Sequence, residues 1–220
     1  MVMVYNKSIE TKKIIVKAYE KLFYYKGYAD TSIRDIANEA NIPFSNIYYY
    51  YKNKKEMAYD LIDKISAQHL EIINEQLNVS AALSTSIELR QIYGIIASNF
   101  NYRRFLGETS IDNVEAIYMK NTLRQSLSST LDELNITLTD NKYFLNCSTF
   151  AAAISEINID WYLNKINMSH EEVAVHVITL YFNLLSVDQE TINGLLEESK
   201  NLSSTFTVGV MDNFDIYLKD

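Results

Sequence analysis

The chain has 220 residues, and 48% of them are hydrophobic, which is enough for a sizeable core and excludes global disorder. One Pro and five Gly in the whole chain favour long helices over a β architecture with many turns. The single cysteine, Cys147, excludes an internal disulfide, and a net charge of −8 taken alone argues against a nucleic-acid partner.

The first predicted helix covers about residues 8–26. Gly27 follows it at the position where a residue with positive φ commonly ends a helix. Apolar side chains recur along this segment at the spacing of one helical face. They are Ile14, Ala18 and Leu22, flanked by Ile15 and Phe23.

Two short helices are predicted next. Ser32 and Asp35 have the spacing of a capping box, which would open a helix that ends near residue 40. Asn41 tolerates the left-handed conformation and would end that helix. Pro43 suits the first turn of a following helix over about residues 44–50, because its missing N–H has no partner there in any case.

A long helix is predicted over residues 54–77, and Asn53 and Glu56 have the spacing of a second capping box at its start. The residues after about Thr205 have poor helix propensity and receive no assignment. Further helices are expected at residues 84–101, 111–118, 120–134, 141–164, 170–186 and 189–206.

Two short helices separated by about three residues, packed on a longer first helix, form a helix-turn-helix DNA-binding unit. We therefore expect an all-α fold in which such a domain, residues 1–53, precedes a larger helical regulatory and dimerisation domain, residues 54–220. Residues 1–55 have ten Lys and Arg against five Asp and Glu, whereas residues 56–220 have ten against 23. This basic N-terminal part fits a DNA partner, because binding follows the local potential.

The N-terminal segment carries the runs Gly27-Tyr28, Thr31-Ser32-Ile33-Arg34-Asp35-Ile36-Ala37, Ala40-Asn41-Ile42 and Ile47-Tyr48-Tyr49-Tyr50-Tyr51-Lys52-Asn53-Lys54. Over about residues 11–60 it resembles the tetracycline-repressor (TetR/AcrR) family. Two positions depart from the family pattern: Asn41 stands where Gly is usual in the turn, and Pro43 stands where a small polar cap is usual. Both residue types tolerate the required backbone, so the resemblance still implies the same fold.

Residues of the helix-turn-helix have side chains suited to DNA. Arg34, at the start of the second helix, suits a phosphate, and Lys54 and Lys55 add charge at another helix start. Asn46 suits a pair of hydrogen bonds with adenine, and Phe44 suits a thymine methyl. The residues expected at DNA, on these grounds and on the resemblance, are Thr31, Ser32, Arg34, Phe44, Ser45, Asn46, Tyr48, Tyr49, Lys54 and Lys55.

The four consecutive tyrosines admit two interpretations. For Tyr50 and Tyr51 we favour core packing, whereas for Tyr48 and Tyr49 we favour hydroxyl contacts with phosphates over packing. Arg34 taken alone would be an ordinary surface charge, and only its place within the motif gives it a role.

The helix predicted at 170–186 is apolar on nearly every face, so it must be buried on every face. One side would pack on its own domain and the other on a second copy, which would also supply a second recognition helix. The alternative is a helix at the centre of a monomeric core. The dimer is expected to form through the helices at 170–186 and 141–164, with the contacts Trp161, Val173, Val177, Leu180, Tyr181 and Leu184.

The resemblance also implies a pocket for a small, largely apolar effector among the helices at 84–101, 111–134 and 141–164. Aromatic walls with a few polar groups are typical of small-molecule sites. An inward Glu156 would favour a cationic ligand, whereas the alternative is ordinary core packing with Glu156 at the surface. The candidate lining residues are Tyr93, Phe100, Tyr118, Phe144, Cys147 and Glu156.

Together these patterns predict a cytoplasmic, homodimeric, sequence-specific DNA-binding transcriptional regulator, a repressor that leaves its double-stranded operator when an effector binds. A DNA-binding adaptor or architectural protein controlled by a protein partner is the first alternative, and a helical carrier or enzyme is the second. The sequence has no phosphate-binding glycine loop and no spacing of His and Cys typical of a metal site, so we expect no enzyme activity, metal or cofactor. No segment predicts a membrane span or an N-terminal secretory leader.

Overall fold

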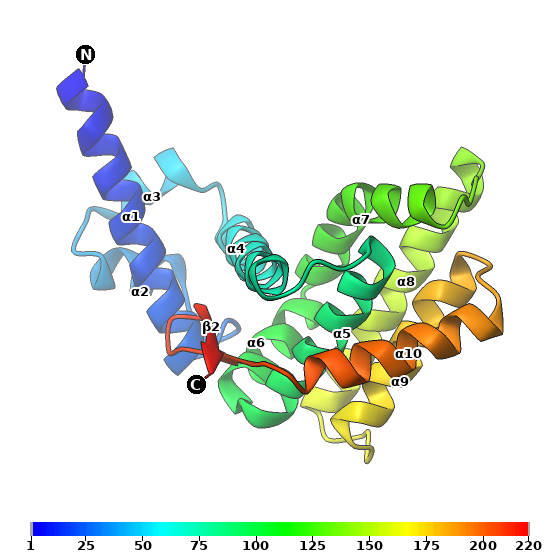
Figure 1. Ribbon diagram of the computed structural model, residues 1–220. Helices are drawn as coiled ribbons and strands as arrows, with labels where there is room; N and C mark the ends of the chain where they lie inside the picture. Colours follow the sequence, from blue (N-terminus) through cyan, green and yellow to red (C-terminus); the bar gives the residue numbers. More distant parts are fainter. Residues whose placement is uncertain (1, 220) are drawn as a thin grey trace.

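The computed structural model describes residues 2–219, and within them the side chains of residues 8–122 and 127–219. The described chain folds into ten helices and one two-stranded hairpin (Figure 1). The all-α prediction is confirmed, with the hairpin added where the sequence received no assignment. The elements are α1 (Val2–Tyr25), α2 (Ile33–Glu39), α3 (Phe44–Tyr50), α4 (Lys54–Gln76), α5 (Ala81–Ser98), α6 (Phe100–Ile111), α7 (Val114–Glu133), α8 (Asp140–Tyr162), α9 (His170–Leu184), α10 (Gln189–Ser203), β1 (Thr207–Val210) and β2 (Ile216–Lys219).

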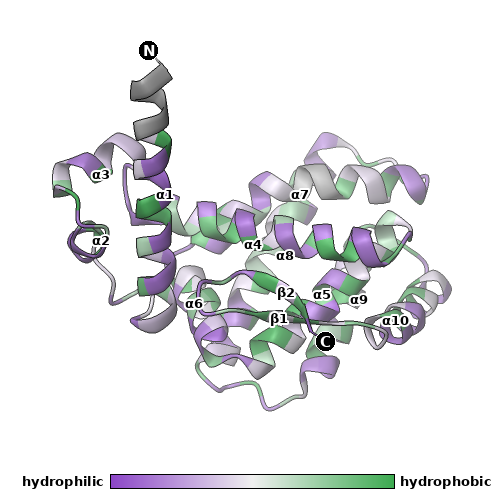
Figure 2. Ribbon diagram, turned by 60° about the vertical axis from the view of Figure 1, so that its left-hand side comes forward, coloured by the Kyte–Doolittle hydropathy of each residue, from purple (hydrophilic) through white to green (hydrophobic). Residues whose placement is uncertain are grey.

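Helices α1–α3 form a unit that we call the head (residues 2–53), and the remainder, from α4 onward, is the body. Figure 2 shows α2 and α3 on the side of α1 that faces away from the body. The buried face of α1 is rotated from the predicted one. Ile15, Tyr19 and Phe23 are buried, whereas Ile14 is 46% exposed. Large apolar and aromatic side chains at i, i+4 and i+8 thus decide which stripe faces the core.

The local signals of the helix-turn-helix are confirmed. Ser32 and Asp35 form the full capping box, and Asn41 has a φ of 50°, in the left-handed region. Pro43 was predicted in the first turn of α3. It lies one position earlier, at the N-cap, and Phe44 is the first helical residue. The recognition helix therefore begins without a side-chain cap.

The body is built around α5, which packs against α9 on one side and α10 on another, while α8 packs against α6 and α7. Asn99 both ends α5 and opens α6, where its side chain accepts a hydrogen bond from Tyr102 N–H. This one-residue corner explains why the predicted helix at 84–101 overran α5 and why α6 was missed. The predicted helices at 111–118 and 120–134 are one helix, α7. No helix of the described chain is both long and apolar enough to cross a membrane.

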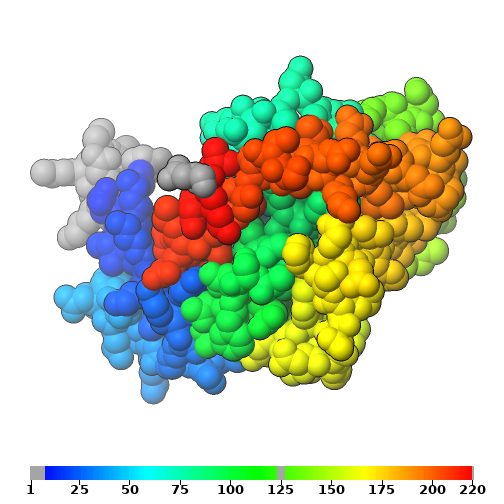
Figure 3. Space-filling model, turned by 60° about the horizontal axis from the view of Figure 1, so that its bottom comes forward, coloured from blue at the N-terminus to red at the C-terminus, as the bar shows by residue number. Residues whose placement is uncertain are grey.

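The C-terminal hairpin connects the body to the head. Its antiparallel strands pair Val208 with Leu218, and its turn buries Phe214 completely. The Phe214 ring lies 4.8 Å from the ring of Phe105 on α6 and 5.2 Å from that of Tyr24 on α1, measured between centroids. In the space-filling view the hairpin fills the angle between α1 and α6 (Figure 3).

Candidate functional site

The outer side of α3 presents a row of exposed side chains. Ile47 points inward and is fully buried, which fixes the rotation of this short helix on the head. Tyr49 is 80% exposed, so its hydroxyl is available to an outside partner. The predicted recognition residues Phe44, Ser45, Asn46, Tyr48 and Tyr49 are all exposed on this helix.

Arg34 belongs to the same surface. It is exposed on α2, and its guanidinium lies 5.6 Å from the centroid of the Phe44 ring, so α2 and α3 present a cation beside an aromatic ring. Ser32 is also exposed, although its hydroxyl is hydrogen-bonded to Asp35. Thr31 was predicted to lie at DNA, but its side chain is buried, and its hydroxyl donates to the Gly27 carbonyl at 2.6 Å.

The two lysines predicted at phosphates have partners within the protein. The Lys54 ammonium donates to the carbonyls of Tyr28 and Ala29, at 2.6 and 3.2 Å, and its burial lowers the lysine pKa. The Lys55 ammonium lies 2.7 Å from the Asp112 carboxylate. In this conformation Lys54 therefore holds the head against the body, and Lys55 is paired within the body, so both cations predicted at phosphates already have partners.

Tyr50 and Tyr51 pack against the head and body, as the sequence predicted for this pair. Tyr51 is buried, donates to Asp60 at 2.7 Å and meets the Tyr19 ring edge-on. Tyr50 is half-buried, with its hydroxyl 3.4 Å from that of Ser8. Both side chains thus support the recognition helix from behind.

A joint between head and body lies at the end of α6. The Arg104 guanidinium donates to the Tyr24 carbonyl at 2.6 Å, and Glu108 accepts from Ala29 N–H at 2.8 Å. Asp112 accepts from the Tyr28 hydroxyl at 2.6 Å. Arg104 and Glu108 were not predicted, because they lie between the helices predicted at 84–101 and 111–118, and no role was predicted for Asp112. The available sequence signal was the spacing of three charged residues, Arg104, Glu108 and Asp112, at every fourth position.

Gly27 is the counterpart of this joint on the head. Its φ is +100°, which strongly favours glycine, and a Cβ there would lie 3.2 Å from the Glu108 carboxylate. The glycine therefore ends α1 as predicted and also admits the close approach of α6.

A cavity of about 490 Å³ lies inside the body, which is a usual size for a small-molecule site. It is bounded by α4, α5, α6, α7, α8 and α9. Tyr93 and Tyr118 line it as predicted, while most of the other lining residues were not anticipated. Its described lining residues are Ile62, Asp63, Ile65, Ser66, Ala67, His69, Leu70, Thr85, Glu88, Leu89, Ile92, Tyr93, Tyr102, Leu106, Glu115, Tyr118, Met119, Thr122, Phe150, Ile154, Asn158 and Tyr181.

Four predicted pocket residues lie elsewhere. Phe100 and Phe144 are each 56% exposed, and Glu156 is exposed on the outer side of α8. Cys147 is buried but lines a separate, very small cavity of about 10 Å³. Helices that are apolar on several sides leave their rotation undetermined by sequence, so the wrong face of α8 was chosen. Phe100 opens α6, whereas the prediction placed it on the helix at 84–101.

The polar groups of the cavity were the larger omission. Glu88 accepts a hydrogen bond from the Ser66 hydroxyl at 3.3 Å, and Glu115 accepts from Asn158 Nδ2 at 2.8 Å and from the Ser110 hydroxyl. Burial raises the pKa of Glu88 to about 7 and also raises that of Glu115. A glutamate within the apolar run of α5 was the signal available in the sequence.

The predicted dimer contacts are mostly internal. Trp161, Val173, Val177 and Tyr181 are buried within the chain itself, because α9 lies between α5, α8 and α10. The burial of Val173, Val177 and Tyr181 agrees with the alternative of a central helix, and Trp161 is buried on α8. Leu180 and Leu184 remain partly exposed.

Comparison with known proteins agrees with the geometry of the head. Residues 15–60 match the profile of the bacterial regulatory proteins of the tetR family. The chain thus carries a TetR-type module over residues 15–60. Within the TetR module it is 44% identical over 63 residues to an uncharacterised helix-turn-helix transcriptional regulator of Lactococcus lactis subsp. lactis, covering 27% of this chain and 32% of the relative. TtgR of Pseudomonas putida is 37% identical over 60 residues, covering 27% and 29%. The chain thus spans about a third of the length of these relatives.

The likeness of fold extends over the body. The structure of RolR in complex with resorcinol superposes with a TM-score of 0.61, covering 87% of this chain and 95% of RolR at 14% identity. A TetR-family regulator from Streptomyces coelicolor A3 has a TM-score of 0.53, covering 80% and 95% at 16% identity. At these identities the match shows the TetR fold, in which a helical body follows the head.

Proposed function

We propose that this TetR-family chain is a sequence-specific transcriptional repressor that binds operator DNA through α3 and leaves it when a small effector occupies the body cavity. The exposed row on α3 carries the proposal. Asn46 and Tyr49 extend outward while Ile47 anchors the helix, which is the arrangement that a helix needs to enter a major groove. Arg34 beside this row supplies charge for the DNA backbone.

The cavity is joined to the head by α6. Tyr102 and Leu106 line the cavity, while Arg104 and Glu108 on the same helix bind the end of α1 and the loop after it. An effector that moved α6 would therefore move the head. Such an effector shifts the equilibrium only if it binds the DNA-free arrangement more tightly. The resorcinol bound to RolR, a protein of the same fold, supports a small-molecule effector.

A homodimer completes the proposal, because two heads read two half-sites of an operator. The exposed side of the first two turns of α8 is the surface that we assign to the second copy. Phe144 and Leu145 are 56% and 66% exposed there, and Leu180 of the adjoining helix α9 is partly exposed. An apolar surface of this kind on a soluble protein commonly marks a protein interface.

The test begins with DNA selected by the purified protein from a random duplex library. We expect one enriched, partly palindromic motif. Fluorescence anisotropy on that motif then gives the affinity of the wild type, of Asn46→Ala and of Glu156→Gln, the last being a matched change of an exposed body residue. Loss of affinity in Asn46→Ala alone supports the proposal. No enrichment overturns it, and enriched DNA that no small molecule releases favours an adaptor controlled by a protein partner.

A further inference from the structure

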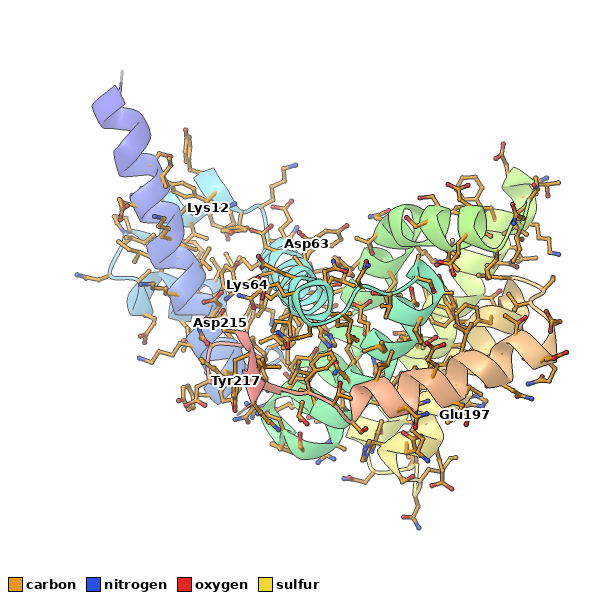
Figure 4. The ribbon with its side chains drawn as sticks, in the orientation of Figure 1. Lys12, Asp63, Lys64, Glu197, Asp215 and Tyr217 are labelled. Carbon is orange, nitrogen blue, oxygen red and sulfur yellow. The ribbon has the colours of Figure 1, made fainter. Side chains whose placement is uncertain are left out.

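Acidic side chains line the body cavity, with no Lys or Arg among the described lining residues. Three carboxyl side chains line it: Glu88 from α5, Glu115 from α7 and the exposed Asp63 from α4. In Figure 4 the Asp63 side chain extends from the side of α4 that faces α7. A buried carboxylate that stays ionised is ordinarily paired with a cation, and no described lining residue supplies one.

The other titratable groups around the cavity supply no positive charge. His69 of α4 is 1% exposed, its ring nitrogen lies 2.8 Å from the Gln91 amide oxygen, and burial lowers its pKa to about 4, so the ring is neutral at pH 7. The remaining groups are phenols from four helices, which are neutral at that pH. They are Tyr93 of α5, Tyr102 of α6, Tyr118 of α7 and Tyr181 of α9.

Glu88 has the more open carboxyl group of the two. Its one hydrogen bond, from Ser66, is 3.3 Å long, whereas Glu115 is held by both Ser110 and Asn158. Asn158 itself is 4% exposed, and its Oδ1 atom is buried without a hydrogen-bond partner. An acceptor left in this state beside the cavity indicates a polar group of a ligand, because an unsatisfied buried oxygen costs free energy.

We propose that the cavity takes a lipophilic organic cation, an aromatic or alkyl ammonium, with Glu88 as its counter-ion. This inference rests on the proposed function, since it names the chemical class of the effector. The rings of Tyr93, Tyr118 and Phe150 supply apolar contact and negative ring faces for the rest of such a molecule. Glu115 adds a second acidic group, from α7.

Binding is coupled to a proton. The raised pKa of Glu88 means that a substantial share of its carboxyl groups is protonated at neutral pH. A cation stabilises the ionised form, so the protonated acid and the free cation become a carboxylate–cation pair and one released proton. Affinity for a permanent cation therefore rises about tenfold per pH unit below pH 7 and becomes constant above it.

The probes are benzyltrimethylammonium, which has no titratable proton, and neopentylbenzene, its uncharged isostere with carbon in place of nitrogen. Resorcinol serves as a neutral hydrogen-bonding probe. Isothermal titration of the full chain, in buffers of different ionisation enthalpy at pH 6 and pH 8, gives the affinity and the number of protons released. The variants are Glu88→Gln and, as a matched control on the outer side of α8, Glu156→Gln.

We expect benzyltrimethylammonium to bind more tightly than neopentylbenzene and resorcinol, and to release close to one proton at pH 6 and almost none at pH 8. Glu88→Gln should weaken its binding by about tenfold or more and abolish proton release, and Glu156→Gln should change neither. The inference is overturned if the cation does not bind, if the isostere binds equally well, or if proton release survives in Glu88→Gln. The comparison of cation with isostere uses the wild type, so it decides the matter even if a variant fails to fold.

Anisotropy with the selected DNA separates this inference from the proposed function. Cation binding with proton release but without any loss of DNA affinity would uphold the ligand class and contradict effector release. Release of DNA by resorcinol but not by benzyltrimethylammonium would uphold the proposed function and overturn the ligand class.

Discussion

The ammonium of Lys64 on α4 lies 2.6 Å from the Asp215 carboxylate in the C-terminal hairpin (Figure 4). The same ammonium lies 2.6 Å from the carboxylate of Glu20 on α1, whose side chain is almost completely buried. One cation thus joins the head, the first helix of the body and the hairpin. Burial raises the pKa of Glu20, which Lys64 opposes.

Replacing Lys64 with Met should therefore lower the free energy of unfolding. Removal of the cation leaves two carboxylates facing each other, and the expected loss is about 2 kcal/mol, between the values for exposed and buried pairs. Urea denaturation at pH 7 measures it. Lys17→Met, an exposed lysine on α1, is the control and should change stability by less than about 0.5 kcal/mol. Equal losses in the two variants would contradict a joining role for Lys64.

Two substitutions in the head should affect DNA binding differently. Asn46→Ala should cost about 1–3 kcal/mol on the selected operator and little on random DNA, because it removes a base contact. Arg34→Ala should weaken both equally and reduce the salt slope by about 1, because it removes a phosphate contact. Anisotropy titrations at several salt concentrations measure both effects. A uniform loss in Asn46→Ala would place this residue at the DNA backbone instead.

Glu88→Gln should stabilise the protein above neutral pH. Burial raises the pKa of Glu88 from 4.5 to about 7, so the folded chain holds this proton more tightly than the unfolded chain. The wild type accordingly loses stability relative to the variant as pH rises from about 4.5 to about 7, by up to about 1.4 kcal/mol per pH unit. Unfolding free energies at pH 5, 6, 7 and 8 test this, and a difference independent of pH would refute it.

His69→Gln should show the opposite sign. Burial lowers the pKa of His69 from 6.5 to about 4, so the unfolded chain binds this proton more tightly than the folded chain. The wild type should therefore gain stability relative to the variant as pH rises from about 4 to about 6.5. The same denaturation series measures it. A relative loss over that interval would show that the ring is charged in the folded protein.

Leu145→Asp should convert the proposed homodimer into a monomer. A charge at the centre of an apolar contact remains unpaired when the second copy docks. Sedimentation at micromolar concentration measures the change, and Leu163→Asp, also exposed and near the end of α8, should leave the dimer intact. If both variants stay dimeric, the second copy docks on another surface.

The head was predictable because its signals are local. The Ser32–Asp35 cap, the left-handed Asn41 and the buried Ile47 each lie within one or two turns of the structure that they determine. The body was less predictable because its helices are apolar on several sides. Sequence periodicity does not decide whether Glu156 or Glu88 faces inward, since the packing of six helices around the cavity decides it.

The C-terminal hairpin shows the same limit for strands. Thr207 and Val208 have β-type side chains, yet two short strands do not hold together alone. The hairpin is stable here because Phe214 packs against aromatic rings from α1 and α6, which are distant in the sequence.

Helix α6 contacts the cavity and the head with two different faces. Tyr102 and Leu106 face the cavity, and Arg104 and Glu108, displaced by two positions, lie on nearly the opposite side, because each residue turns the helix by about 100°. Substitutions that suit the cavity to a different molecule can therefore leave the contacts with the head intact. The fold is accordingly a favourable scaffold for biosensor engineering. Ligand preference can be redesigned on the cavity side of α6, while the side that contacts the head is kept unchanged.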